Sequence, residues 1–388
     1  MFMFVSMSSI FIWESGIYGF MHFKYIQNWE LSLTPIIYLF IIFIILFIPI
    51  KRFNEKKIES IELDDTFKIE SIGNFSIIYG IVLLFILILF VDYEVALESA
   101  SEAYKDNEEG ELAMPILIFR LYTLHRLLFP FILLLGFYYL SFKRSQWFKT
   151  LLLLSSAILP KVFVAIVTVS RGNLFFLLIE LMICFFLFKN FIPKKTKRIL
   201  YLGSLALLTI LLPVVVIFTT SRFSSSEYSS LLSVFKYFGE SFLNFNCVFW
   251  GNIDEYPMGE FKFPFIYELF DSPHTFLSRR ERYNFFSDMT GTNVLLFKTL
   301  VGDFYVEYGV LLGGIVLVII SRLFSKVIMF NSKVKFSTLI LFFYYYELVF
   351  VVVFDLLWHG KTLFQMIVFT SLLFVFIRYK FELSLRTE

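Results

Sequence analysis

The chain is divided into long blocks of apolar residues, and this pattern constrains its fold more than any single motif does. A run of about 20 apolar residues can cross the hydrocarbon core of a bilayer as a helix. Ten such blocks occur, at about 2–20, 33–50, 73–91, 116–141, 150–169, 174–190, 199–219, 304–323, 337–355 and 364–378. Backbone groups in lipid must hydrogen-bond within the chain, so each block is predicted to be helical. The sequence therefore predicts an all-α, polytopic integral membrane protein with about 10 transmembrane helices and one membrane domain, 1–388.

The composition excludes several classes of protein. Hydrophobic residues make up 58% of the chain and charged residues 17%, and the mean hydropathy is +0.77. A soluble globule with this balance exposes large apolar patches, which excludes a soluble enzyme, a coiled coil and a disordered chain. The net charge of +2 argues against a nucleic-acid partner. Two separated cysteines, Cys184 and Cys247, and four scattered histidines predict neither a disulfide framework nor a metal site.

The connections between the blocks alternate in charge, which predicts the orientation of the chain. Lysine and arginine collect in cytoplasmic connections. The basic set comprises residues 51–57, 143–149, 194–198, 322–335 and the tail after 378. The other set includes the stretch 92–111, with eight carboxylates and one lysine. Ten spans then place both termini in the cytoplasm. The first block lacks a basic start and a small-residue cleavage site, so it is not interpreted as a cleaved signal peptide.

One outward loop, 220–303, is far longer than the others, and loops of this length usually have a function. Its many aromatic and leucine residues argue against disorder. An amphipathic helix is predicted within it, with Lys236 and Glu240 on its polar face. Its apolar face comprises Leu231, Phe235, Phe238, Phe242 and Phe245. The helix is expected either to lie on the outer membrane surface or over a cavity, or to form a packed loop without a catalytic part.

Ionisable side chains in or beside the spans are the main candidates for a functional site, because burying charge in a membrane is costly. The predicted outward arginines are Arg171, Arg222, Arg279, Arg280 and Arg282; Arg120, His125, Arg126 and Lys161 lie in or near spans. Arginine forks match phosphate oxygens, so the outward group suggests a lipid-linked phosphate ligand. The alternative is that these arginines pair with Asp303, Glu307 or the acidic loop, or face water.

Arg171 is the most distinctive of these arginines because of its neighbours. It lies in the predicted outward turn between the fifth and sixth spans, beside Gly172. Ser170 and Asn173 can cap the helix that follows, and the free amides of a helix N-terminus favour an anion.

Four groups of motifs resemble the Wzy-type oligosaccharide repeat unit polymerases of bacterial O-antigen and capsule synthesis. They are 9–13 with 31–33; 170–172; 220–222 with Tyr228 and 244–246; and 291–294 with 302–309. Some members carry an Arg-X10-Gly pattern in outward loops, and Arg280 and Gly291 fit that spacing.

The resemblance implies a reaction and its partners. A polyprenyl-diphosphate-linked glycan is the donor, a newly flipped lipid-linked repeat unit is the acceptor, and polyprenyl diphosphate leaves. The resemblance also implies a C-type glycosyltransferase fold in the bacterial inner membrane, with a periplasmic loop at 220–303 between spans 7 and 8. No nucleotide sugar, metal or other cofactor is expected. Membrane lipid and a chain-length regulator are the other expected partners, and nucleic acid is not one.

The candidate site residues follow from this chemistry. Arginines stabilise the leaving diphosphate, and Arg171, Arg222 and Arg280 are the candidates, with Arg279 or Arg282 as substitutes for Arg280. His359 is the candidate catalytic group that accepts or orients the acceptor hydroxyl, with Asp303 as catalytic support and Glu307 as a further candidate. Asp303 can instead cap the eighth span. The candidate sugar-binding residues are Tyr228, Tyr305 and Trp358.

Two other functions fit the same sequence. An O-antigen ligase uses the same donor with a lipid A core acceptor. A polysaccharide flippase or other transporter is the second alternative, and Glu14, Glu180 and Glu347 within predicted spans favour it. The absence of an internal duplication argues against a transporter.

Overall fold

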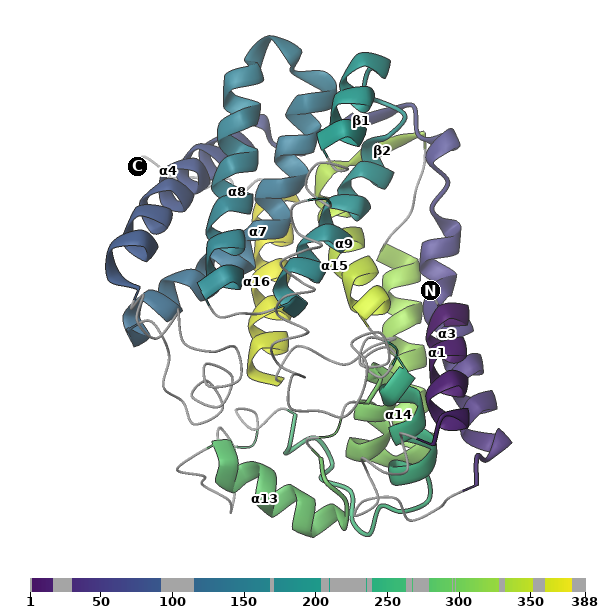
Figure 1. Cartoon of the computed structure of the whole chain (residues 1–388). Helices are drawn as coiled ribbons and strands as arrows, with labels where there is room; N and C mark the ends of the chain where they lie inside the picture. Colours follow the sequence, from purple (N-terminus) through teal and green to yellow (C-terminus); the bar gives the residue numbers. More distant parts are fainter. Residues whose placement is uncertain are drawn as a thin grey trace, which may run out of the picture. The chain divides into compact units, whose positions relative to one another are not determined.

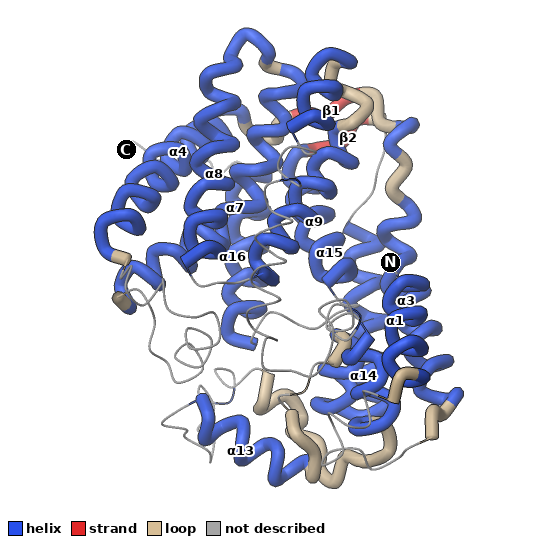
Figure 2. The backbone as a smooth tube through the Cα atoms, in the orientation of Figure 1, coloured by secondary structure: helices blue, strands red, loops and turns tan. Residues whose placement is uncertain are grey.

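The computed structural model is almost entirely helical in the part of the chain that it describes (Figures 1 and 2). The described residues are 2–16, 30–91, 115–167, 171–203, 209, 235, 239–262, 267, 279–294, 296, 298–327, 332–351 and 360–378. This confirms the predicted all-α class, apart from two three-residue strands that hydropathy did not indicate.

The helices follow the apolar blocks closely at most of their ends. They are α1 (Phe2–Glu14), α3 (Leu33–Arg52), α4 (Thr66–Phe90), α7 (Ile116–Phe142), α8 (Trp147–Val167), α9 (Arg171–Phe188), α13 (Arg279–Thr290), α14 (Leu300–Val327), α15 (Phe336–Val351) and α16 (Gly360–Arg378). Residues 194–203 and 239–244 are also helical. Single turns are formed by Glu55–Lys57, Arg144–Gln146 and, as π-helix, Phe245–Phe249.

Five helices in the described residues are long and apolar enough to cross a membrane. They are Leu33–Arg52, Thr66–Phe90, Leu117–Phe142, Arg144–Val167 and Leu300–Val327. Shorter apolar helices lie in three further predicted spans, within α9, α15 and α16. The block 199–219 falls mostly outside the described residues. The described helices are therefore compatible with an all-α membrane protein, and the count of ten spans stays a prediction.

The chain divides into two compact units, each made of segments that are distant in sequence. Unit 1 comprises Met1–Phe53, Glu227–Met329 and Leu348–Val368. Unit 2 comprises Asn54–Ser226, Phe330–Glu347 and Phe369–Glu388. The long loop belongs largely to unit 1, and the single membrane domain stays a prediction.

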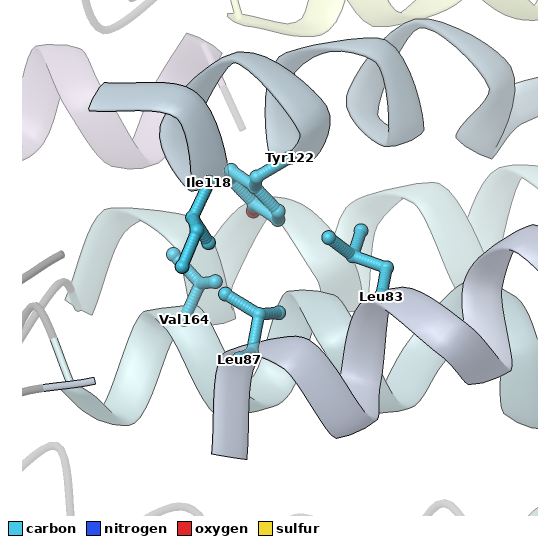
Figure 3. Close-up of a cluster of buried hydrophobic side chains, with 5 residues drawn as sticks. All are labelled: Leu83, Leu87, Ile118, Tyr122 and Val164. Atoms are coloured by element: carbon cyan, nitrogen blue, oxygen red, sulfur yellow. The ribbon is translucent and has the colours of Figure 1, made fainter. Parts of the chain in front are cut away.

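Unit 2 is built around the packing of α4, α7, α8 and α9. Figure 3 shows one of its apolar clusters, in which Leu83 and Leu87 of α4 meet Ile118 and Tyr122 of α7 and Val164 of α8. Gly80 allows α4 to approach α8, because a Cβ there would lie 2.5 Å from the carbonyl oxygen of Ser156. Small residues at such crossings let helix backbones pack closely in membranes.

A short parallel strand pair joins two distant parts of unit 2. Strand β1 (Ser60–Glu62) pairs with β2 (Lys333–Lys335), with Ile61 opposite Val334. The Asp64 carboxylate then accepts hydrogen bonds from the backbone N–H and the hydroxyl of Ser337, both at 2.8 Å. Asp64 therefore satisfies a free amide at the start of α15 from across the unit.

In unit 1, α3 packs along α14. The Ser321 hydroxyl donates to the carbonyl of Ile45 at 2.6 Å, and Arg52 donates to the carbonyl of Ser325 at 3.1 Å. Tyr38 donates to the carbonyl of Val310 at 3.0 Å. These bonds fix α3 beside the part of α14 that follows a break in its backbone.

Candidate functional site

Helix α14 is interrupted at Gly309, and this break sets the geometry of the candidate site. The backbone there has φ 75° and ψ −175°, a conformation that glycine adopts without steric cost. A Cβ on Gly313 would lie 2.6 Å from the carbonyl oxygen of Phe304, so the chain folds back closely after the break. The predicted span 304–323 is corrected accordingly: helix begins at Leu300, and its first turns form a separate half-helix.

Four charged side chains meet at this half-helix, and we call them the unit 1 quartet: Lys262, Lys298, Asp303 and Glu307. Asp303 is 1% exposed, and its Oδ1 lies 2.6 Å from Nζ of Lys262 and 3.8 Å from Nζ of Lys298. Lys298 also donates to the carbonyl of Val294 at 2.6 Å. The two lysines come from the long loop and the two carboxylates from one face of the half-helix. The quartet therefore fixes the described end of the loop to α14.

Glu307 holds a tight turn of the loop through its backbone and its side chain. Its Oε2 accepts the N–H of Gly259 and its carbonyl accepts the N–H of Met258, both at 2.9 Å. Met258 has a positive φ of 55°, which is unusual for a residue with a side chain. The Glu307 side chain is 1% exposed, and its Oε1 has no hydrogen-bond partner among the described residues. Backbone strain beside an unsatisfied buried carboxyl is typical of functional sites.

Aromatic side chains pack against the other side of the half-helix. The rings of Trp250 and Tyr305 stack with centroids 5.2 Å apart and an interplanar angle of 17°. The Tyr305 hydroxyl accepts the N–H of Gly251 at 2.7 Å. Tyr305 is thus buried with an engaged hydroxyl, while Trp250 stays partly exposed. The sugar-binding role of Tyr305 remains a prediction, and Trp250 is the more accessible ring.

Hydrogen bonds attach the loop to the N-terminal segments of unit 1. The Asn246 side chain donates to the carbonyl of Ser32 at 2.7 Å and accepts the N–H of Ser32 at 2.9 Å. The Ser9 hydroxyl donates to the carbonyl of Gly239 at 2.9 Å. Motif segments 9–13, 31–33, 244–246 and 302–309, far apart in sequence, therefore all belong to one packed unit.

The predicted amphipathic helix is confirmed only in part. Residues 239–249 are helical and Phe245 is buried, but Glu240 is only 5% exposed and does not lie on a solvated polar face. The reason is that this helix is covered on more than one side: Gly239, beside Glu240, packs against Ser9 of α1, and the following turn Phe245–Phe249 contacts α3 and α14. Lys236 and Phe238 lie outside the described residues.

The structure describes some of the predicted site residues and not others. Asp303 and Tyr305 lie in unit 1, close to the quartet and the aromatic stack. Asp303 does not cap its helix, because the Thr299 hydroxyl takes that role by accepting the N–H of Gly302 at 3.0 Å. Arg171 begins α9 and Arg280 lies in α13, but their side chains are outside the description. Arg222, Tyr228, Trp358 and His359 lie wholly outside the described residues.

The structure adds detail on four residues of the long loop. Lys262 and Lys298 were not predicted as site residues, although each is a lone cation in an aromatic-rich or apolar stretch of the loop. In α13, Arg282 is partly buried, and its Nε has no hydrogen-bond partner among the described residues. Burial raises the pKa of the Cys247 thiol to about 12, so this thiol is not a nucleophile at neutral pH.

Unit 2 contains a second group of buried charges, which we call the unit 2 quartet: Arg126, Lys161, Glu180 and Glu347. The Lys161 ammonium is in direct contact with the Glu180 carboxylate and lies 4.1 Å from the centroid of the Phe129 ring. Glu347 is 5% exposed and lies within electrostatic range of the other three. His125, beside Arg126, makes a 2.9 Å hydrogen bond to the carbonyl of Ser156.

Comparison with known proteins gives no assignment. No family model matches the chain, and no curated protein or solved structure matches it either. Its function must therefore be inferred from the two quartets, the loop and the sequence motifs.

Proposed function

We propose that the chain is a membrane glycosyltransferase that polymerises polyprenyl-diphosphate-linked oligosaccharide repeat units. The growing glycan passes from its lipid diphosphate to the terminal sugar of an incoming lipid-linked unit. In this proposal the loop 220–303 lies on the outer face of the bacterial inner membrane and both termini lie in the cytoplasm. The motif resemblance supplies the reaction, and the packing of unit 1 supports it.

The observation that carries the proposal is the joining of the motif segments in unit 1. Ser9 bonds to Gly239 and Ser32 to Asn246, while Lys262 pairs with Asp303 of segment 302–309. A long loop that is merely a connector has no need of buried ion pairs to a membrane helix, because such pairs are costly to desolvate. This arrangement favours a loop that forms part of a site.

The chemistry divides between cations and an acceptor-orienting group. As the glycosidic bond breaks, negative charge develops on the leaving diphosphate, and fixed cations stabilise it. Arg171, Arg222 and Arg280 remain our candidates, with Arg279 or the partly buried Arg282 as substitutes for Arg280. Asp303 is a positioning residue, since its carboxylate is enclosed by two ammonium groups. His359 is the proposed group that accepts or orients the acceptor hydroxyl, with Tyr228 and Trp358 against the sugar.

A transporter is the second candidate, and the unit 2 quartet favours it. Ionisable residues inside membrane helices often mark pathways for ions or substrates, and Glu180 and Glu347 are both buried there. An O-antigen ligase remains the alternative within the glycosyltransferase class, and the described residues offer no feature that favours it over a polymerase.

The length distribution of lipid-linked glycans in cells with and without the protein separates the three functions. A polymerase predicts that single repeat units accumulate on the lipid carrier, and on lipid A, when the protein is absent. A ligase instead predicts long chains that stay on the carrier, and a flippase predicts units that stay on the cytoplasmic face. Either of the last two results would overturn the proposal.

A further inference from the structure

The unit 2 quartet brings together charged side chains from four different helices. Arg126 is on α7, Lys161 on α8, Glu180 on α9 and Glu347 on α15. Lys161, Glu180 and Glu347 are buried, and Arg126 is partly exposed. The polymerisation chemistry proposed above uses none of them. A cluster that is so costly to bury requires its own account.

The two carboxyl groups of the quartet have different surroundings. Glu180 is in direct contact with the ammonium of Lys161, which also lies over the Phe129 ring. Glu347 has no such contact: its buried Oε2 has no hydrogen-bond partner among the described residues. Lys161 is thus in contact with Glu180, and the partly exposed Arg126 lies within electrostatic range of both carboxyl groups.

Other titratable groups near Glu347 do not supply the missing donor. On its own helix, the Tyr344 hydroxyl donates to the carbonyl of Leu127 at 2.8 Å. His125, which precedes Arg126 on α7, makes its hydrogen bond to the carbonyl of Ser156 on α8. On α9, Glu180 repels a negative charge on Glu347.

The helix segment around Glu347 is deeply buried, with Phe343 and Tyr345 fully buried and Glu347 itself 5% exposed. An ionised carboxyl with an unpaired oxygen in such a place costs several kcal/mol, and carboxyl groups avoid this cost by taking up a proton. The hydrogen-bonding needs of the two forms also favour protonation. An ionised carboxylate needs several donors, whereas the carboxylic acid donates one hydrogen bond and needs one acceptor for it.

We propose that Glu347 is a proton-binding site inside unit 2, with Lys161–Glu180 as a fixed ion pair beside it. The ligand is a proton from water, which converts the Glu347 carboxylate to a carboxylic acid and returns to water when the acid ionises. Protonation removes one negative charge beside Lys161 and Arg126. The charge of unit 2 thereby depends on pH. This property is separate from the proposed polymerisation of glycans.

A hydrophobic carbodiimide tests this directly on the full-length protein in detergent. Dicyclohexylcarbodiimide adds to a protonated carboxyl, and the adduct rearranges to a stable N-acylurea that mass spectrometry locates. We expect modification at Glu347 and not at Glu180. Above its midpoint, labelling should fall about tenfold for each pH unit, as the protonated fraction does. Lys161→Met provides the matched control, because removing the ammonium should make Glu180 reactive as well.

Infrared spectroscopy tests the same proposal without a reagent that has to reach the buried carboxyl group. The difference spectrum between the wild type and Glu347→Gln should contain the C=O stretch of a protonated carboxyl at neutral pH, and the one for Glu180→Gln should not. A carboxylate band for Glu347 at neutral pH would overturn the proposal, as would equal labelling of Glu180 and Glu347 in the wild type.

Discussion

The two quartets contain the same kinds of ionisable group, two basic side chains and two carboxyl groups each, but they are assembled in different ways. The unit 1 quartet comes from one continuous stretch, 262–307, and both of its carboxyl groups lie on the same half-helix. The unit 2 quartet comes from four helices between positions 126 and 347. The first therefore forms only when a loop docks onto α14, and the second forms only when a helical bundle is complete. The first is suited to holding a site loop in place, and the second to linking helices.

The largest effect is expected where a cation is removed from the fully formed ion pair. Lys161→Met removes the contact partner of the buried Glu180, which must then take up a proton or stay charged without its pair, and breaking a buried pair in this way costs about 3–5 kcal/mol. Thermal unfolding in detergent measures this loss. The double variant Lys161→Met/Glu180→Gln should recover most of it, and Lys195→Met, at an exposed position of unit 2, should have little effect. If the single variant is as stable as the wild type, Lys161–Glu180 does not stabilise the bundle.

In unit 1, the corresponding change should loosen the loop. Among the described residues, Lys262→Met leaves Asp303 with Lys298 as its ion-pair partner, at 3.8 Å, and leaving a buried acceptor poorly satisfied costs about 1–3 kcal/mol. Limited proteolysis should then cut within 220–303 faster, while the helices of unit 2 stay protected. Asp288→Asn, at an exposed position in α13, is the control and should not change the cleavage rate. Unchanged proteolysis in Lys262→Met would show that the quartet does not hold the loop.

The contrast between these units also shows what the sequence could predict. The apolar block 33–50 corresponds to the helix Leu33–Arg52, and the block 116–141 to Ile116–Phe142. Such helices are predictable because whether a segment enters lipid depends on its own apolar residues and not on distant ones. The break at Gly309 was missed, because it depends on contacts of Gly313 with Phe304 that only the folded chain makes.

The site was less predictable than the helices, because the side chains that pair in it are separated in the sequence. Asp303 was identified from its place beside a span, but nothing in the sequence assigns Lys262 and Lys298 to it. Glu240 was wrongly placed on a polar face, because helical periodicity does not register a second covering surface. The strand pair β1–β2 was missed, because three residues are too few for a periodic signal.

Helix packing within unit 2 gives a smaller effect than its ion pair does. Gly80→Ala places a methyl group 2.5 Å from the carbonyl oxygen of Ser156, and overpacking of this kind costs about 1–3 kcal/mol. Gly203→Ala is a matched control in the same unit, because its Cβ would have nothing within 4 Å. Equal melting temperatures for the two variants would contradict the close approach of α4 and α8.

The smallest effect is expected at the native cysteines. Because burial raises the pKa of Cys247 to about 12, and Cys184 is buried as well, neither thiol should react with maleimide near neutral pH unless the protein is unfolded. Added cysteines can then report the topology.

Ser225→Cys should react with an impermeant reagent in spheroplasts and Thr196→Cys should not. The reverse result would invert the orientation and move the loop to the cytoplasm.

The most direct test of the whole account is elongation of a synthetic polyprenyl-diphosphate-linked repeat unit by the purified protein in detergent. We expect a ladder of longer products without added nucleotide, metal or membrane gradient. Arg171→Ala should abolish the ladder and Arg171→Lys should restore only part of it, because lysine lacks the planar fork. His359→Ala should slow turnover by about 100-fold or more. No product from folded wild-type protein with the authentic substrate would contradict the assignment of this chain as a polymerase.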